Sequence, residues 1–156
     1  MQYGELPKGK IDGSKFKVSI LAPHFNNKLV MELLENTQNE LYENDVKKEN
    51  IKIIRVTGAL ELPLTAKIEA LKNAPDVIIA LGVVIKGTTD HYDMVNHASH
   101  NGLMQVQLET QIPIIFGVLS CRTPEQAIQR VRGSAINKGA EFARTALFQA
   151  TINQQL

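Results

Sequence analysis

The stretch from Val77 to Tyr92 constrains the fold of this chain more than any other. Its first part, 77–85, holds only apolar or small residues and is rich in Val and Ile. Such a run is too short to span a membrane and is typical of a strand covered on both faces of a parallel sheet. The segment Lys-Gly-Thr-Thr-Asp at 86–90 then favours a strand-to-helix turn that ends in a helix N-cap. Open α/β sheets bind anionic ligands at such turns, so we expect the chemistry here, beside His91.

Strand and helix patterns alternate along the rest of the chain. Apolar runs and period-two alternation predict strands at 16–22, 51–56, 76–85 and 112–119. Apolar residues at helical spacing predict helices at 28–43, 62–73, 91–107, 123–132 and from about 137 onward. This alternation implies parallel βαβ units with right-handed crossovers. We therefore predict an α/β fold, a flavodoxin-like three-layer α/β/α sandwich with a four-stranded parallel sheet, in a strand order such as 2-1-3-4.

Polar residues mark several of the predicted helix starts. Asn26 or Asn27 is in place to cap the helix at 28–43, and Thr123 precedes Pro124 at the start of a later helix. On the helix at 91–107 we expect one face to be buried. That face comprises Val95, Ala98, Gly102, Leu103 and Val106.

The chain has the length of a single domain, 1–156. Its 44% hydrophobic and 21% charged residues are typical of a soluble globular protein, and a net charge of +1 gives no indication of a nucleic-acid partner. We expect no signal peptide, transit segment or membrane span, and hence a cytoplasmic location. The single cysteine, Cys121, ends an apolar run and is expected to be a buried, unreactive thiol. The polar residues 1–15 are expected to be either disordered or an extended arm on a neighbouring subunit, where the arm would add a strand.

In the predicted strand order, the switch point lies between the first and third strands. The loops at their carboxyl ends, 23–27 and 86–90, would gather five side chains: Phe25, Asn26, Thr88, Thr89 and His91. An aromatic ring can stack on a planar ligand, a helix N-terminus can hold a phosphate, and a histidine can transfer protons near neutral pH. The sequence therefore favours a site for a planar heterocycle and a phosphorylated partner molecule.

These residues also have simpler interpretations. A lone histidine at a helix start is more often a solvated surface residue than a catalyst, and Phe25 and Phe116 would by default belong to the core. His97 and His100 stand on one predicted helix, but they lack the cysteine or acidic neighbours of a zinc site, so we expect no metal ion. Glu61 is more often a helix-capping carboxylate than a ligand contact. The Gly-Thr-Thr turn has neither the Walker nor the dinucleotide glycine spacing.

Six short segments, in this order and at this spacing, resemble one known family. They are Phe-Asn at 25–26, Gly-Ala-Leu-Glu-Leu-Pro at 58–63, Ala-Leu-Gly-Val-Val-Ile-Lys-Gly-Thr-Thr-Asp-His-Tyr-Asp at 80–93, Pro-Ile-Ile-Phe-Gly-Val-Leu at 113–119, Glu-Gln-Ala-Ile-Gln-Arg at 125–130 and Asn-Lys-Gly at 137–139. From about Lys15 to the last helix, the chain resembles lumazine synthase, the penultimate enzyme of riboflavin biosynthesis. The resemblance implies a transferase without metal or organic cofactor. Its substrates would be 5-amino-6-(ribitylamino)uracil and 3,4-dihydroxy-2-butanone 4-phosphate. The product would be 6,7-dimethyl-8-ribityllumazine, with phosphate and water released.

By matched position, the resemblance implies a set of substrate contacts around the pyrimidine. These residues are Phe25, Asn26, Ala59, Leu60, Glu61, Val83, Val84 and Ile85. Phe25 would stack on the pyrimidine ring. Asn26, Ala59 and Glu61 would contact the ribityl chain and its surroundings. Backbone groups at 84–85 would line the pyrimidine site.

The resemblance also implies residues for the phosphate and for proton transfer. Gly87, Thr88 and Thr89 would cradle the phosphate, with assistance from Arg130, and His91 would transfer protons during imine formation and phosphate elimination. The family supplies part of each site from the adjacent subunit, and three residues here match that part: Phe116, Arg130 and Lys138. The site would therefore be complete only at an interface between subunits.

Three positions depart from the family pattern. Leu60 stands where an aromatic residue is usual before the glutamate, Thr57 where proline is usual, and His24 where arginine is frequent. Leu60 would loosen packing beside the ribityl chain, and none of the three removes an implied catalytic group. We therefore expect activity with an altered substrate affinity.

The resemblance further implies a homo-oligomer. The family forms pentamers, some members pack pentamers into an icosahedral shell of about 60 subunits, and riboflavin synthase is a further implied partner. We expect a pentamer, and the short segment from Arg132 to Lys138 is compatible with a shell. Two rival hypotheses are a lumazine- or flavin-binding paralogue without turnover and a shell-forming protein without chemistry. The presence of Phe25, His91, Arg130 and Lys138 argues against both.

Overall fold

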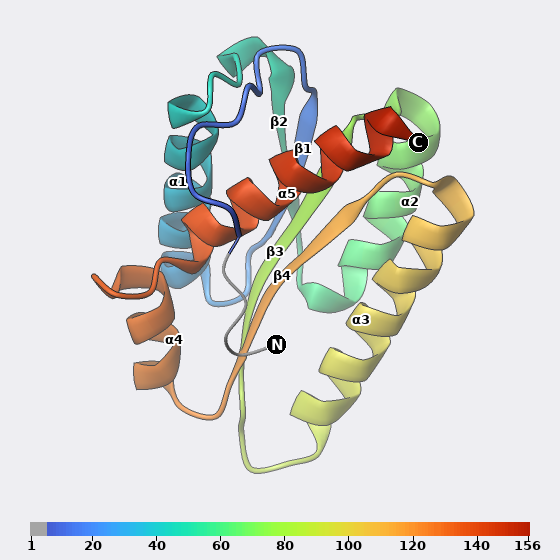
Figure 1. Cartoon of the computed structure of the whole chain (residues 1–156). Coiled ribbons are helices and arrows are strands. Elements are labelled where there is room, and N and C mark those ends of the chain that lie inside the picture. Colours follow the sequence, from blue (N-terminus) through green and yellow to red (C-terminus); the bar gives the residue numbers. More distant parts are fainter. Residues whose placement is uncertain (1–5) are drawn as a thin grey trace.

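A parallel sheet forms the middle layer of the protein. The computed structural model describes residues 6–156, and the four strands stand in the order β2-β1-β3-β4 (Figure 1). They are β1 (Val18–Pro23), β2 (Ile51–Val56), β3 (Val77–Ile85) and β4 (Ile114–Cys121). Each pairing between neighbouring strands is parallel. The predicted sheet and its strand order are therefore confirmed.

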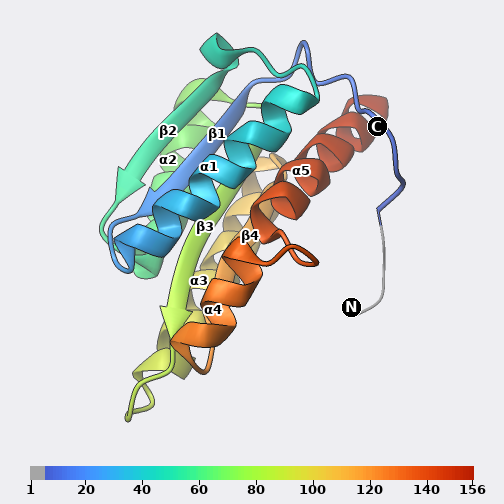
Figure 2. The same ribbon diagram turned by 90° about the vertical axis from the view of Figure 1, so that its left-hand side faces the viewer.

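Helices cover both faces of this sheet, as Figures 1 and 2 show. One face carries α1 (Asn27–Glu43), α4 (Pro124–Arg132) and α5 (Lys138–Gln155), and the other carries α2 (Leu62–Asn73) and α3 (His91–Thr110). Two 3-10 turns, η1 (Lys48–Asn50) and η2 (Ala59–Glu61), precede β2 and α2. The result is the predicted three-layer α/β/α sandwich. None of the helices within residues 6–156 combines the length and the apolar character that crossing a membrane requires.

The third strand, β3, is buried on both of its faces. Val77, Ile79 and Leu81 pack in the layer with α1, α4 and α5, whereas Ile78 and Ala80 pack toward α2 and α3. Alternate side chains of a strand point to opposite faces of the sheet. Because both faces are covered here, the strand needs apolar residues at every position, which explains the continuous run in the sequence.

Several element ends differ from the predicted ones by two or three residues. The strand predicted at 16–22 begins at Val18, because the amide of Phe16 donates to the carbonyl of Gly13 in a turn, at 3.1 Å. The strand predicted at 112–119 spans 114–121. The helix predicted to end at 107 continues to Thr110, and Gln111 ends it in the left-handed conformation with φ 58°.

The buried face of α3 contains Ser99 where Ala98 was predicted. Ala98 is exposed, whereas Ser99 is buried and its Oγ donates to the carbonyl oxygen of Val95 at 2.7 Å. A hydroxyl that bonds to the carbonyl one turn earlier can be buried with its polar atom satisfied. The apolar pattern alone could not reveal this, because it treats serine as an outward-facing residue.

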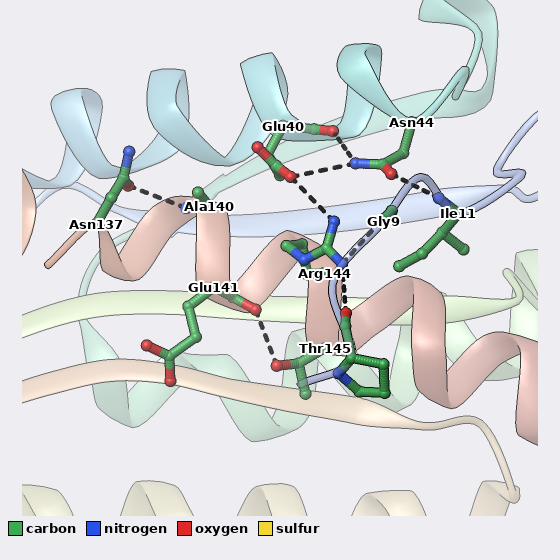
Figure 3. A network of polar contacts seen from close by, with 10 residues as sticks. Gly9, Ile11, Glu40, Asn44, Asn137, Ala140, Glu141, Arg144 and Thr145 are labelled. Atoms are coloured by element: carbon green, nitrogen blue, oxygen red, sulfur yellow. Dashed lines mark hydrogen bonds and ion pairs between the residues drawn. The ribbon is translucent and has the colours of Figure 1, made fainter. Parts of the chain in front are cut away.

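An arginine of the last helix anchors the segment 7–13 on the protein's own subunit (Figure 3). Arg144 of α5 donates to the carbonyl oxygens of Pro7, at 2.8 Å, and Gly9, at 3.0 Å. Just beyond α1, the carbonyl oxygen of Asn44 accepts a hydrogen bond from the amide of Gly13, at 2.8 Å. These contacts hold residues 7–13 against α1 and α5 of the same chain, so this segment is ordered, and its contact with a neighbouring subunit stays a prediction. Residues 1–5 lie outside the described residues, and an arm built from them stays a prediction.

Candidate active site

A hollow of about 480 Å³ opens at the carboxyl ends of β1 and β3, the predicted switch point. Its lining residues come from the β1–α1 loop, η2, the end of β3 and the start of α3. They are Pro23, Phe25, Asn26, Gly58, Ala59, Leu60, Glu61, Gly82, Val83, Val84, Ile85, His91 and Val95. Nine of these were predicted as site residues from the sequence. The fold therefore brings together segments that lie far apart in the chain.

Phe25 forms an exposed aromatic wall of this hollow. Its side chain is 67% exposed, so the core does not hold the ring. Its amide donates to the carbonyl of Thr57 at 3.2 Å, and the ring lies against Gly58. A Cβ at position 58 would approach the ring to 2.7 Å, which is closer than real Cβ contacts come. A side chain at position 58 would therefore displace the ring of Phe25 from its present place.

Asn26 joins the β1–α1 loop to the end of β3. Its Nδ2 donates to the carbonyl oxygen of Val83 at 2.7 Å. The residue occupies the N-cap position of α1, but it has φ 57° and its side chain makes no capping hydrogen bond. The prediction that Asn26 or Asn27 caps this helix with its side chain is therefore wrong. The left-handed conformation, which asparagine tolerates well, turns the amide toward the hollow instead.

The turn after β3 is open to solvent. The amide of Lys86 donates to the carbonyl of Cys121 at 2.9 Å, and this bond is the last link to β4 before the chain leaves the sheet. Positions 87–89, the predicted phosphate cradle, are exposed and connect two lining residues of the hollow, Ile85 and His91. Thr89 Oγ1 accepts a hydrogen bond from the amide of His91 at 3.3 Å. The structure thus places the predicted cradle at the rim of the hollow, without side chains that fill it.

His91 and Glu61 bring the titratable groups to the hollow. His91 is the first residue of α3 and is exposed, and Val95, one turn later on the same helix, also lines the hollow. Glu61 ends η2 and is exposed as well. Apolar side chains such as Leu60 and Val84 form much of the remaining wall. A planar ring with a polar tail fits such a mixture of apolar surface, one aromatic ring and two groups able to accept or donate protons.

Phe116, Arg130 and Lys138 do not line this hollow. Phe116 of β4 is half-buried, and its ring meets that of His100 edge-on, with centroids 5.8 Å apart. Arg130 Nη1 donates to the carbonyl oxygen of Gln126, within α4, at 3.0 Å. Lys138, at the start of α5, forms an ion pair with Glu141 at 3.0 Å. Within one chain, the structure therefore leaves these three predicted residues outside the site.

Four lining residues were not predicted from the sequence: Pro23, Gly58, Gly82 and Val95. Val95 could have been found, because it stands four residues after His91 and so shares its helix face. Gly58 carried a weaker signal, a glycine next to a predicted helix start. Gly82 looked like an ordinary residue of a buried strand. Cys121 is buried as predicted, and burial raises the pKa of its thiol although the charge of Arg130 opposes this change.

A buried carboxylate lies at the amino end of the strands, beside a separate hollow of about 270 Å³. Glu69 of α2 is 4% exposed and accepts hydrogen bonds from Ser19 Oγ at 2.8 Å, Lys52 Nζ at 2.9 Å and Asn73 Nδ2 at 2.8 Å. Burial by itself raises the pKa of this carboxyl group, but the hydrogen bonds from Lys52, Asn73 and Ser19 hold the pKa below its ordinary value. A carboxylate with three donors is engaged in holding the fold together, and we do not count it as a catalytic group.

Two further observations concern other sites. A hollow of about 880 Å³ near the ends of α3 and α5 is lined by residues 107–108, 111, 113–115, 149, 153 and 156, none of which carries a titratable side chain. In the part of the chain that the structure describes, no three His, Cys, Asp or Glu side chains are grouped as metal ligands. Of these hollows in the described part of the chain, the one at β1 and β3 combines an aromatic ring with titratable side chains.

This fold and this hollow place the chain among α/β enzymes that act on small molecules at the switch point of a parallel sheet. A family model described as 6,7-dimethyl-8-ribityllumazine synthase matches residues 15–154. A synthase of that name from Leuconostoc mesenteroides is 44% identical over 146 residues, 94% of each chain. Another from Protochlamydia amoebophila is 39% identical over 149 residues, 96% of this chain and 87% of the relative. The chain belongs to the 6,7-dimethyl-8-ribityllumazine synthase family, which confirms the resemblance seen in the sequence.

Proposed function

We propose that this protein is an active 6,7-dimethyl-8-ribityllumazine synthase of riboflavin biosynthesis. It condenses 5-amino-6-(ribitylamino)uracil with 3,4-dihydroxy-2-butanone 4-phosphate. The observation that carries the proposal is the hollow at β1 and β3, where nine residues matched to the family's substrate site surround one space. Family membership supports the same reaction, because relatives that share 39% and 44% of their residues carry this name.

The first chemical step joins the two substrates. The 5-amino group of the pyrimidine attacks the ketone, and the resulting carbinolamine loses water to form an imine. Phe25 stacks on the pyrimidine and Asn26 and Glu61 meet the ribityl chain, so the amine is held in line with the ketone. Such positioning of two reactants supplies a large share of the rate in bimolecular reactions. His91, exposed at the edge of the hollow, transfers protons to and from the nitrogen and oxygen.

The second step removes phosphate, and the third closes the ring. Loss of a proton from the imine's carbon chain drives out inorganic phosphate, and the ribitylamino nitrogen then attacks the remaining carbonyl group with a further loss of water. The amides of 87–89 offer donors to the departing phosphate, and the start of α3, just after them, adds a positive helix end. Arg130 from a neighbouring subunit holds the same phosphate through paired hydrogen bonds.

The surface supports an oligomer. Six large apolar side chains on the neighbouring helices α2 and α3 are between 45% and 71% exposed: Leu64, Ile68, Leu71, Met94, Met104 and Leu108. Apolar exposure on this scale marks surfaces that other protein chains cover. We propose a pentamer in which Phe116, Arg130 and Lys138 complete the site of the adjacent subunit. The connection between α4 and α5, residues 133–137, is short enough for pentamers to pack into a shell of about 60 subunits. We further propose a location in the cytoplasm and riboflavin synthase as a partner enzyme.

The decisive experiment mixes the purified protein with both substrates. We expect release of inorganic phosphate together with the absorbance of the lumazine, without any added metal or organic cofactor. Binding of the pyrimidine without phosphate release would overturn the proposal in favour of a non-catalytic binding protein. Assembly without binding of either substrate would indicate a structural shell protein. Light scattering of the same sample measures whether the mass is that of a pentamer or of a shell.

A further inference from the structure

One guanidinium group holds the loop between β1 and α1. Arg55, the second-last residue of β2, is half-buried. Its Nε donates to the carbonyl oxygen of Ala22 at 2.9 Å, and its Nη2 donates to the carbonyl oxygen of Pro23 at 3.1 Å. The same Nη2 donates to Oδ1 of Asn27 at 2.7 Å. One side chain therefore ties the last residues of β1 to the first residue of α1.

Two further groups meet the same guanidinium, one in this loop and one in α1. Nη2 also lies 3.3 Å from Nδ1 of His24. Nη1 lies 3.1 Å from the sulfur of Met31 in α1. The backbone beyond Arg55 adds to this anchoring, since the carbonyl of Val56 accepts a hydrogen bond from the amide of His24 at 2.8 Å. The end of β2 thus supports this loop, together with the bond from Asn26 to Val83 of β3.

This support matters because the loop carries two residues of the hollow, Phe25 and Asn26. The ring of Phe25 is 67% exposed, so its position follows the backbone of the loop rather than packing in the core. The contacts of Arg55 lie on both sides of these two residues, at 22–24 before them and at Asn27 after them. A fork of fixed geometry with several donors can hold such a loop in one conformation, which a single flexible ammonium cannot do.

We propose that Arg55 is a positioning residue for the pyrimidine, acting through the β1–α1 loop. It does not line the hollow itself. It fixes the loop so that the ring of Phe25 and the amide of Asn26 meet the substrate in one arrangement. The inference rests on the proposed function, because the pyrimidine is the substrate of that reaction. It assigns a role in substrate recognition to a strand residue whose sequence context indicated only an ordinary strand.

The alternative is a guanidinium that stabilises the fold and nothing more. Arg144 offers a matched comparison, because it also donates to two backbone carbonyl oxygens, those of Pro7 and Gly9 (Figure 3). It holds the segment 7–13, none of whose residues lines the hollow. Loss of either arginine removes hydrogen bonds to an irregular segment. Only the loss of Arg55 should change how the pyrimidine binds.

The test compares the assembled variants Arg55→Ala, Arg55→Lys and Arg144→Ala with the wild type in steady-state kinetics. For Arg55→Ala we expect KM for the pyrimidine to rise between about tenfold and 100-fold, while KM for the phosphorylated substrate changes less than about twofold. Arg55→Lys keeps the positive charge and the aliphatic part of the side chain, so it should raise the pyrimidine KM less, again with little change for the phosphorylated substrate. This variant replaces Arg55→Ala in the test if Arg55→Ala fails to assemble. Arg144→Ala should leave both constants near their wild-type values. An unchanged pyrimidine KM in both Arg55 variants, or an equal change for both substrates, would overturn the proposal.

Direct binding separates this inference from the proposed function. Calorimetric titration with the pyrimidine alone requires no turnover and reports the affinity of wild type and variants. If the wild type binds the pyrimidine without releasing phosphate, the proposed reaction fails, and weaker binding by Arg55→Ala still supports the role of Arg55. If the wild type turns over and the Arg55 variants bind with wild-type affinity, the reaction stands and the role of Arg55 is refuted. A wild type that neither binds nor turns over refutes both.

Discussion

Two groups among the residues predicted for the site differ in how they are held. The hollow group consists of the nine predicted residues that line the space at β1 and β3, and the outer group consists of Phe116, Arg130 and Lys138. Long-range contacts between loops and strand ends position the hollow group, such as the bond from Asn26 to Val83. By contrast, the two cations of the outer group have partners on their own helices, Gln126 and Glu141. The fold of one chain assembles the first group, whereas we propose that the second group acts in the site of another chain.

The strongest test of this division is complementation between two impaired variants, assayed with the phosphorylated substrate below its KM. We expect His91→Ala, from the hollow group, to lower the rate at least about 100-fold, and Arg130→Ala, from the outer group, to lower it through its raised KM for that substrate. When the two variants are co-expressed, some interfaces combine an intact His91 with an intact Arg130 from the neighbour. In a random mixture these interfaces make up on the order of a quarter of the total. Turnover of the mixed assembly should therefore rise well above the average of the two parent variants.

The matched control uses two variants of the same group. Co-expression of His91→Ala with Phe25→Ala creates no intact site, because both residues belong to the same chain's hollow. Activity should then stay at or below the average of the parents. Equal recovery in both mixtures, or no recovery in mixtures shown by mass spectrometry to be co-assembled, would contradict the division into two chains.

The two groups should also differ in which substrate they affect. Arg130→Ala should raise KM for the phosphorylated substrate about tenfold to 100-fold, because paired hydrogen bonds to a charged group are lost. Phe25→Ala should raise KM for the pyrimidine about tenfold, through the loss of a stacking surface. Steady-state kinetics with each substrate varied in turn measures both effects. If a variant raises the KM of both substrates to the same extent, the substituted residue does not have the assigned role.

A smaller effect is expected within the hollow group at Leu60. This residue is 48% exposed and lines the hollow where the family usually has an aromatic side chain. Leu60→Phe adds flat apolar surface beside the ribityl chain, so we expect KM for the pyrimidine to fall by about two- to fivefold. The KM for the phosphorylated substrate should not change. A higher pyrimidine KM would show that leucine is the better fit in this particular hollow.

The smallest kinetic effect is expected at the amino end of the sheet, outside both groups. Glu69→Gln should leave both KM values unchanged but lower the free energy of unfolding near pH 7 by about 1–3 kcal/mol. The pKa of Glu69 is lowered in the folded protein, so its stabilisation is full above the ordinary carboxyl range and is lost as pH falls through the lowered pKa. The variant lacks this contribution, so its stability should fall less steeply from neutral to acidic pH. Urea unfolding at fixed protein concentration across that range provides the measurement.

Much of the fold could be predicted because one signal dominated each element. The continuous apolar run of β3 indicated a strand covered on both faces, and the alternation of strands and helices indicated parallel βαβ units. Element ends were less certain. The helix α3 ends three residues later than predicted, at Thr110, because the polar residues before that end are compatible with a helix and with a loop. Burial of Ser99 was missed because the hydrogen bond that satisfies it depends on the folded helix.

For the site, topology predicted the hollow group better than local patterns did. Once β1 and β3 were expected to be neighbours, their carboxyl-end loops had to meet. The local role of Asn26 was wrong, since its side chain bonds across the sheet to Val83 rather than along its own helix. Arg55 went unnoticed because its acceptors are mainly backbone carbonyls and loop side chains, whose directions no sequence pattern encodes. The outer group came from family resemblance alone, and its role remains a prediction.

The direct pairing of β1 with β3 also has a consequence for how the enzyme matures after synthesis. Val18 pairs with Val77, so α1, β2 and α2 all separate two strands that must meet. Such non-local pairing delays folding, because a long loop must close before the contacts that stabilise it can form. The loops that form the walls of the hollow follow these two strands, so the hollow cannot form before the strands have paired. Newly made chains will therefore contain helices before they contain a binding site, and recovery of pyrimidine binding after dilution from denaturant should lag behind recovery of helical circular dichroism.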